Sequence, residues 1–362
     1  MKTTTALPRI GLKSALAAAA VAFVIAPGVQ TLHATVAASF TIVNHANSQP
    51  LSLYGYEGNV ILLDFWAYWC VPCQSAARDI EPNVVQYYRN AGGNNNGVPV
   101  QVISVNIDCS SLASENNYIT VNGLELVADD CNRVAFSQFD NGYIPQFGVI
   151  NGTTNSSNYA AWQILYSPYG YATNSTVPTL KSYIESVQTP APVCTLTNPA
   201  NGAVIAPANI PLGARLVTNG KLIKKVEFYN GGTLLGSITN TSYRLITNNP
   251  TSTITWNTNY TLIWSNVSVG AKSVFARAYY GASSSVDSPA VNFTVAAPVL
   301  ARLSPLGTNL LLTWTGGSGT YQVQSCTNPF NACWQNCGAV VTCTNMTLVR
   351  SNKMSFYRVK CQ

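Results

Sequence analysis

The chain has 362 residues, of which 47% are apolar and only 9% are charged, and its formal net charge is +6. This length exceeds that of one typical domain, so two or three domains are expected. Three of the positive charges, Lys2, Arg9 and Lys13, stand near the start of the chain. Without these three the net charge is +3, which is too small to indicate a nucleic-acid partner.

Residues 1–38 have the order of a secretory signal peptide. The basic residues are followed by an uncharged apolar stretch from Ser14 to Ala26 and then by small residues up to Ala38. The apolar stretch is short for a membrane-spanning helix, although retention as an anchor is the alternative. We therefore predict an exported bacterial protein that is periplasmic, bound to the cell surface or secreted.

The ten cysteines of an exported chain predict disulfides. Cys70 and Cys73 form one expected pair, and Cys109 with Cys131 forms a second. Zinc ligation in the C-terminal tail is the alternative that export disfavours. The remaining candidates for structural disulfides, whose connectivity the sequence does not define, are Cys194, Cys326, Cys333, Cys337, Cys343 and Cys361.

The sequence Cys70-Val71-Pro72-Cys73 follows an apolar, aromatic run over residues 60–69. If Cys70 caps a helix that begins here, the unpaired N–H groups and the positive end of the helix dipole stabilise a thiolate on Cys70. Pro72 suits the first turn, where its missing N–H is not needed. A zinc site would need four ligands, and the two histidines have no ligand spacing to this pair. A redox-active Cys70–Cys73 disulfide is thus predicted, with no metal or other cofactor; a purely structural disulfide is the alternative.

Residues 39–188 alternate strand-like runs with helix-like stretches, which indicates an α/β domain. The segments 58–73 and 143–152 follow the motif order of the thioredoxin fold, and this region resembles the TlpA and ResA type of thiol-disulfide oxidoreductase. The resemblance implies that Ile144-Pro145 forms the cis-proline loop against which substrate chains pair.

The resemblance also assigns roles near the cysteines. The resemblance makes Cys73 the cysteine that resolves the mixed disulfide, and Asp64 matches a buried aspartate that relays the Cys73 proton. Burial should raise the pKa of Asp64 toward neutrality. A carboxylate satisfied by a backbone donor is the alternative. Trp69 is expected to form an exposed surface for substrates with Val71, Pro72 and Ile144, whereas Trp66 is expected in the core. Val71 offers the thiolate no charge or hydrogen bond, which favours a moderate or reducing potential.

One departure from the resemblance concerns the helix after Cys73. The proline that usually kinks this helix is absent at its expected place, and Pro82 follows about one turn later. The helix is therefore expected to begin or bend differently.

Residues 189–297 form the second predicted domain, an immunoglobulin-like β-sandwich. Two strand-like runs flank Asn230-Gly231-Gly232, which predicts a hairpin because Asn and Gly tolerate positive φ. The run 226–236 resembles a signature of bacterial immunoglobulin-like modules.

Residues 298–362 form the third, a small cysteine-rich β module that resembles the fibronectin type III modules of exported bacterial proteins. Its strand-like runs are 310–314, 320–324 and 356–359. A surface ligand for these two β modules is one partner that the architecture allows.

The leading interpretation is an exported thiol-disulfide oxidoreductase, an enzyme that exchanges disulfides with protein substrates and needs a separate redox partner. A non-enzymatic adhesion protein on a thioredoxin scaffold is the first alternative. A peroxiredoxin-like peroxidase is the second, and it is disfavoured because Ala67 stands where that chemistry needs a threonine.

Overall fold

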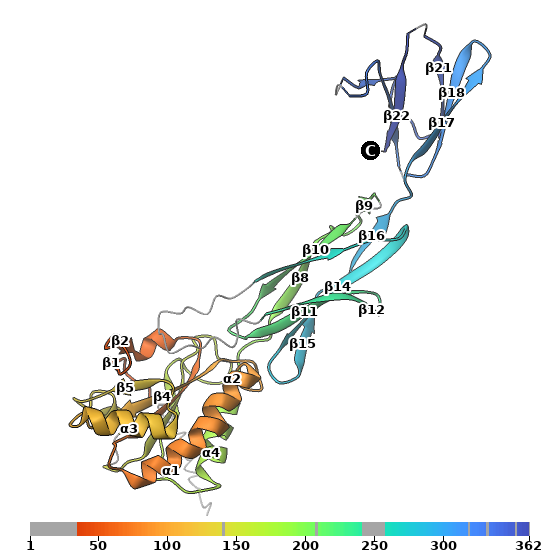
Figure 1. Ribbon diagram of the computed structural model, residues 1–362. Coiled ribbons are helices and arrows are strands. Elements are labelled where there is room, and N and C mark those ends of the chain that lie inside the picture. Colours follow the sequence, from red (N-terminus) through yellow and green to blue (C-terminus); the bar gives the residue numbers. More distant parts are fainter. Residues whose placement is uncertain are drawn as a thin grey trace, which may run out of the picture. The chain divides into compact units, whose positions relative to one another are not determined.

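A computed structural model gives the arrangement of the chain (Figure 1). The structure describes residues 35–139, 142–206, 209–240, 258–317, 319–330, 333–351 and 353–361. The predicted signal peptide lies almost entirely outside this part of the chain. Within the described ranges, no helix combines the length and apolarity needed to cross a bilayer.

The first domain is built on a mixed seven-stranded sheet of order β2-β1-β5-β4-β3-β6-β7. Central strands β3 and β4 are parallel, whereas β6 and β7 continue the sheet in the antiparallel sense. The strands are β1 (Thr41–Asn44), β2 (Pro50–Ser52), β3 (Val60–Trp66), β4 (Val100–Asn106), β5 (Val127–Asp129), β6 (Gln146–Asn151) and β7 (Gln163–Tyr166).

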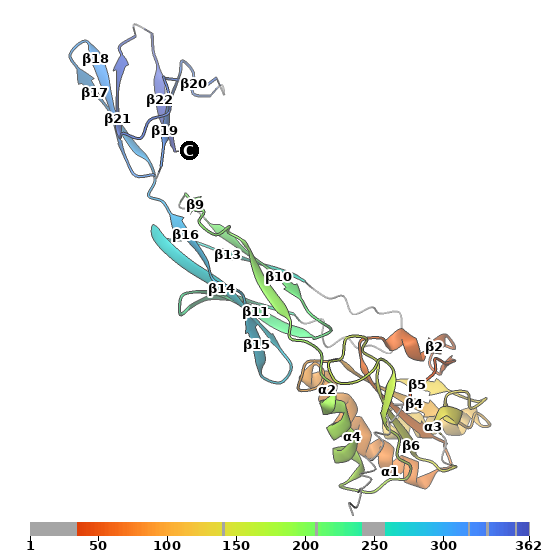
Figure 2. The same cartoon turned by 180° about the vertical axis from the view of Figure 1, so that it is seen from behind.

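Helical segments cover both faces of this sheet (Figure 2). One face packs against the helix that follows the CxxC pair and against the last helix of the domain, and the other packs against α3. The helical segments are η1 (Leu53–Tyr56), α1 (Val71–Ile80), η2 (Glu81–Gln86), α2 (Tyr87–Ala91), α3 (Leu112–Asn122), η3 (Phe136–Gln138) and α4 (Thr176–Ser186).

This arrangement confirms the predicted α/β thioredoxin-like fold. Both central strands are buried along their whole length, as expected for strands that are covered on both faces, and β3 is apolar except for Asp64. The helical stretch after Cys73 is interrupted, since η2 is a π-helical turn that contains Pro82 and lies between α1 and α2. A proline has no N–H for the regular α-helical pattern, which accounts for the change in geometry.

The second region is a sandwich of two sheets with orders β13-β10-β8 and β12-β11-β14-β16-β9, in which β15 also pairs with β14. The predicted hairpin is confirmed, because β11 and β12 are antiparallel around Gly231, whose φ is 55°. The strands are β8 (Val193–Asn198), β9 (Val204–Ile205), β10 (Ile210–Val217), β11 (Ile223–Asn230), β12 (Thr233–Thr239), β13 (Asn259–Trp264), β14 (Gly270–Tyr280), β15 (Ser284–Asp287) and β16 (Val291–Val295).

The third region is also all-β, with one sheet of order β17-β18-β21 and another of order β20-β19-β22. Its small core contains Leu312, Trp314, Tyr321 and Val323. The strands are β17 (Leu300–Leu306), β18 (Asn309–Thr315), β19 (Tyr321–Cys326), β20 (Gln335–Asn336), β21 (Asn345–Val349) and β22 (Phe356–Cys361). The predicted class, an α/β domain followed by two all-β modules, is therefore confirmed.

Candidate functional site

Cys70 and Cys73 form a disulfide at the point where β3 passes into α1. Their sulfurs are 1.99 Å apart and their Cα atoms are 5.3 Å apart. Cys70 is the N-cap residue of α1, and Pro72 lies in the first turn. Both cysteines are buried at the residue level, Cys70 with 4% of its surface exposed and Cys73 with 1%.

The start of α1 favours a negative charge on Cys70. The backbone N–H of Cys73 donates to the Cys70 Sγ atom at 3.2 Å. This donor and the positive end of the helix dipole therefore both face the Cys70 sulfur.

The loop before β6 faces this disulfide. The Ile144–Pro145 peptide bond is cis, and the carbonyl oxygen of Ile144 lies 3.8 Å from Cys70 Sγ. Pro145 is buried and its own carbonyl accepts the N–H of Gly170, which fixes the loop. The two motifs that lie 74 residues apart in the sequence thus meet at one site.

Exposed apolar side chains surround the disulfide. Trp69 and Val71, which flank Cys70, are 56% and 70% exposed. Tyr143 precedes the cis peptide and stacks on Tyr169 at 5.4 Å between ring centroids, and both are also exposed. The sequence analysis missed the two tyrosines. Tyr143 could have been found from its place beside Ile144, but no local signal indicates Tyr169.

Trp66 differs from Trp69, because it is 1% exposed and stacks on Tyr118 of α3 at 4.1 Å. The structure therefore places Trp66 in the core and Trp69 at the surface.

A second disulfide is connected by hydrogen bonds to the segment that precedes Cys70. Cys109 and Cys131 are bonded, with Cα atoms 5.4 Å apart. The residues on either side of Cys109 bind the segment before Cys70: Trp69 Nε1 donates to Asp108 at 2.7 Å, and the Tyr68 hydroxyl lies 3.1 Å from that of Ser110. The segment around Cys109 thus binds the two residues that precede Cys70.

Asp64 lies in the middle of the sheet with 1% of its surface exposed. Its Oδ1 atom has no hydrogen-bond partner among the described residues. Burial alone raises the pKa of Asp64 to about 7, because the charged carboxylate is poorly solvated there. No backbone donor reaches Oδ1 within the described residues, in contrast to the alternative of a satisfied carboxylate.

Glu81, at the end of α1, is a second buried carboxyl that the sequence analysis did not single out. It is 6% exposed, and the pKa of Glu81 is raised to about 7, chiefly by burial. A Glu directly before a proline gives no sequence signal of burial.

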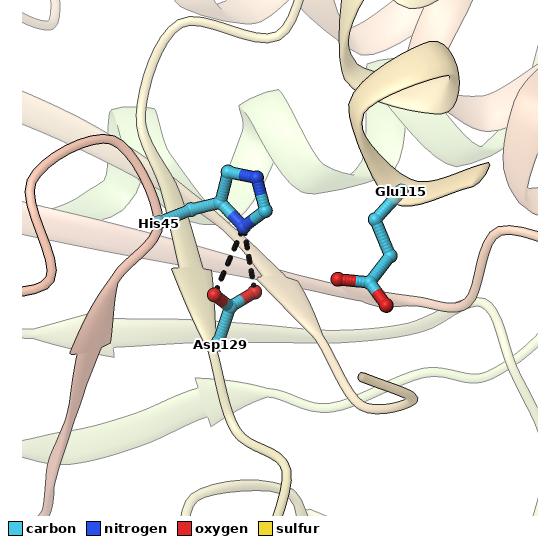
Figure 3. A group of neighbouring side chains, drawn as sticks. All are labelled: His45, Glu115 and Asp129. Atoms are coloured by element: carbon cyan, nitrogen blue, oxygen red, sulfur yellow. Dashed lines mark hydrogen bonds and ion pairs between the residues drawn. The ribbon is translucent and has the colours of Figure 1, made fainter. Parts of the chain in front are cut away.

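A separate group joins β1, α3 and β5 (Figure 3). His45 Nδ1 lies 2.9 and 3.0 Å from the two carboxylate oxygens of Asp129, and its Nε2 lies 3.0 Å from Asn116 Oδ1. Ligand-type atoms of His45, Asp129 and Glu115 all lie within 4.8 Å of one another, so these residues could hold a cation. Glu115 also accepts the backbone N–H of Ser111 at the start of α3. His45 links β5 to α3 through its contacts with Asp129 and Asn116.

Five of the cysteines outside the first domain do not form the predicted disulfides. Cys194 is buried in the core of the sandwich, where its sulfur lies 3.8 Å from the carbonyl of Ala276, and burial raises the pKa of its thiol to about 11. It is the one cysteine in the sequence of that module, which leaves it no partner there. In the third module four cysteines are unpaired, namely Cys326, Cys333, Cys337 and Cys343, and Cys361 packs beside the core on β22.

The family model for a bacterial Ig domain matches residues 192–274. This match confirms the predicted identity of the sandwich, whose strands run from Val193 to Val295. A search of curated proteins finds no match.

Solved structures similar to parts of the chain include the following two. One is a thiol:disulfide interchange protein of the thioredoxin family from Chlorobium tepidum, with 18% identity, 42% of this chain and 96% of that chain covered, and a TM-score of 0.33. The other is StoA from Bacillus subtilis, with 20% identity, coverage of 41% and 97%, and a TM-score of 0.31.

A third similar structure contains fibronectin(III)-like modules of CbhA from Clostridium thermocellum. Its identity is 28%, its coverage is 28% of this chain and 94% of that chain, and its TM-score is 0.22. Each of these structures spans less than half of this chain.

Proposed function

We propose that the first domain is a thiol-disulfide oxidoreductase that exchanges disulfides with protein substrates through Cys70 and Cys73. The observation that carries the proposal is the meeting of three features at one place. A CxxC disulfide caps a helix N-terminus, the cis Ile144–Pro145 loop faces it, and exposed apolar side chains surround both.

In the reducing direction, the Cys70 thiolate attacks one sulfur of a substrate disulfide. A mixed disulfide forms and one substrate thiolate leaves. Cys73 then loses its proton and attacks Cys70 Sγ, which closes the Cys70–Cys73 disulfide and releases the second substrate thiolate. Two electrons pass to the substrate, and a separate dithiol must restore the reduced protein. The reverse sequence oxidises a substrate.

The surroundings of Cys70 favour the reducing direction. Val71 is 70% exposed and supplies no charge or hydrogen bond that would further stabilise the thiolate. A very stable thiolate is what makes an oxidising disulfide, so a potential nearer about −270 mV than about −120 mV is expected. Equilibration of the Cys70–Cys73 pair with glutathione measures this potential.

We further propose that the protein acts outside the cytoplasm. Support comes from the second disulfide, since disulfides persist in oxidising compartments, and from the bacterial Ig domain. The peroxidase alternative has no support at the site, because Ala67 is buried and carries no hydroxyl for a peroxide.

The test is reduction of insulin by the purified full chain with dithiothreitol as the electron source. Wild-type protein should accelerate the reaction, Cys70→Ser should not, and Cys73→Ser should accumulate a mixed disulfide that thiols release. Cys343→Ser, which removes an exposed thiol of the third module, is the matched control and should behave as wild type. Undiminished activity of Cys70→Ser would refute the proposal.

A further inference from the structure

A buried dithiol raises the question of where its proton goes. Cys73 must lose a proton before it attacks Cys70, yet Cys73 and Asp64 are each only 1% exposed. Asp64 can accept that proton only if its carboxyl can then exchange protons with solvent. If the first domain has the proposed oxidoreductase function, the Asp64 carboxyl therefore needs a route by which its proton reaches solvent.

Asp64 and Glu81 approach the same place from the sheet and from the helix. Asp64 on β3 pairs with Ser104 on β4, and both continue the row of Leu62 and Val102 on the face that α1 and η2 cover. Ser104 and Glu81 line one cavity of about 20 Å³, which is enough for a water molecule. Ser104, the neighbour of Asp64 on the adjacent strand, therefore lines the same cavity as Glu81.

Glu81 also lies in line with the resolving cysteine. Cys73, Ala77 and Glu81 follow one another at four-residue spacing along the helix, and the Glu81 N–H donates to the carbonyl of Ala77 in the regular α-helical pattern. All three are buried. Glu81 Oε1 has no hydrogen-bond partner in the described part of the chain, as is also true of Asp64 Oδ1.

The cavity also borders side chains that are partly exposed to solvent. Its lining includes Arg89 of α2 and Glu125, which form an ion pair with side chains 29% and 27% exposed. The other polar groups on the lining are Gln101 and Ser104 of β4, both uncharged. The cavity therefore extends from a buried carboxyl to a partly solvated ion pair.

The electrostatics agree with this geometry. Burial raises the pKa of Glu81 to about 7, the charge of Arg89 lowers it and the charge of Asp64 raises it again. Asp64 in turn lies within electrostatic reach of Tyr118 on α3, whose pKa is raised chiefly by burial. Two carboxyls that both titrate near pH 7 and sense each other can pass a proton with little change in free energy.

We propose that Glu81 is the residue through which Asp64 exchanges its proton with solvent. When Cys73 attacks Cys70, the Cys73 proton moves to the Asp64 carboxylate. It then passes to ionised Glu81 through water in the cavity and leaves past the Arg89–Glu125 ion pair. When the Cys70–Cys73 disulfide is reduced, a proton moves along the same route in the opposite direction, from solvent to Cys73. Glu81 touches no reacting sulfur and acts only through Asp64.

The test compares Glu81→Gln with Glu227→Gln in the full chain. Glu227 is a matched control, because it is a carboxyl only 7% exposed that lies on β11, outside the first domain. With insulin as substrate at pH 7, Glu81→Gln should slow reduction at least about fivefold and remove one inflection from the pH profile. Glu227→Gln should change the rate less than twofold and leave the profile unchanged.

A second measurement does not depend on activity. In protein with 13C-labelled Asp and Glu carboxyls, Asp64 should titrate in two coupled steps in wild type. In Glu81→Gln it should titrate in a single step at lower pH, because the like charge is gone. Glu81→Asp, which keeps the carboxyl, should retain the coupling if Glu81→Gln fails to fold.

The possible outcomes separate the two proposals. An active wild type with superimposable wild-type and Glu81→Gln pH profiles overturns the role of Glu81 alone. Uncoupled Asp64 and Glu81 carboxyls overturn it as well, whatever the activity. A wild type that does not reduce insulin overturns the proposed function instead.

Discussion

Replacing Asp64 by Asn should stabilise the first domain at alkaline pH and leave its stability almost unchanged at pH 4. The buried carboxyl titrates at about 7 instead of 3.8, so between these values the folded protein keeps a proton that the unfolded chain has lost. Stability must then fall as pH rises through this window, because the native state binds more protons than the unfolded state.

The magnitude follows from the width of the window. A pKa difference of one unit corresponds to about 1.36 kcal/mol. The window spans roughly three pH units, so an ionised Asp64 destabilises the folded state by up to about 4 kcal/mol above pH 7. Asn has nearly the same shape and carries no charge. Its amide N–H groups must find acceptors in the core, so we expect a gain of about 2–4 kcal/mol at pH 8.

The assay must report on this domain alone, because a chain of three domains does not unfold in one step. Urea unfolding followed through NMR signals of β3 amides at pH 4 and pH 8 meets this need. Asp79→Asn, at a half-buried carboxylate on α1, is the control and should show no comparable gain on going to pH 8. The same difference between Asp64→Asn and wild type at both pH values would refute the reasoning.

Two further predictions concern the link between the two disulfides. Trp69→Phe keeps an aromatic surface but loses the 2.7 Å hydrogen bond to Asp108, so it should lower the free energy of unfolding by about 1 kcal/mol in the same NMR assay. The double variant Cys109→Ser/Cys131→Ser opens a loop with a sequence separation of 22 and should cost about 3 kcal/mol. Because Cys109 anchors the segment that holds Trp69, this variant should also change the Trp69 fluorescence, and an unaltered spectrum would count against the link.

The features that sequence analysis predicted well depend on local chemistry. Pro72 can occupy the first turn of a helix but not its interior, so the start of α1 beside Cys70 follows from the motif itself. The burial of Asp64 follows from the uninterrupted apolar strand around it. The hairpin at Asn230-Gly231-Gly232 follows from the positive φ that the turn requires.

The features that escaped prediction depend on contacts between distant segments. His45 meets Asp129 across 84 residues of sequence, and Tyr169 stacks on Tyr143 from a different loop. No periodicity or motif connects such pairs, because tertiary packing alone brings them together. The pairing of the cysteines in the third module could not be predicted for a related reason. Oxidising conditions favour disulfides, but the backbone must also bring two cysteines within bonding distance.

The position of Pro82 also determines where Glu81, one of the two buried carboxyls, lies relative to Cys73. Pro82 supplies no N–H to the carbonyl of Arg78, so the regular α-helix cannot continue past Glu81, and the chain continues as the π-helical turn η2. Although η2 begins at Glu81, the Glu81 N–H still donates to the Ala77 carbonyl, so the regular α-helical spacing holds from Cys73 through Ala77 to Glu81 and keeps all three on one stripe. A proline four residues earlier would place the kink between Cys73 and Glu81 and turn the carboxyl away from this stripe. The departure from the usual helix thus aligns Glu81 with the resolving cysteine on the buried side of the helix.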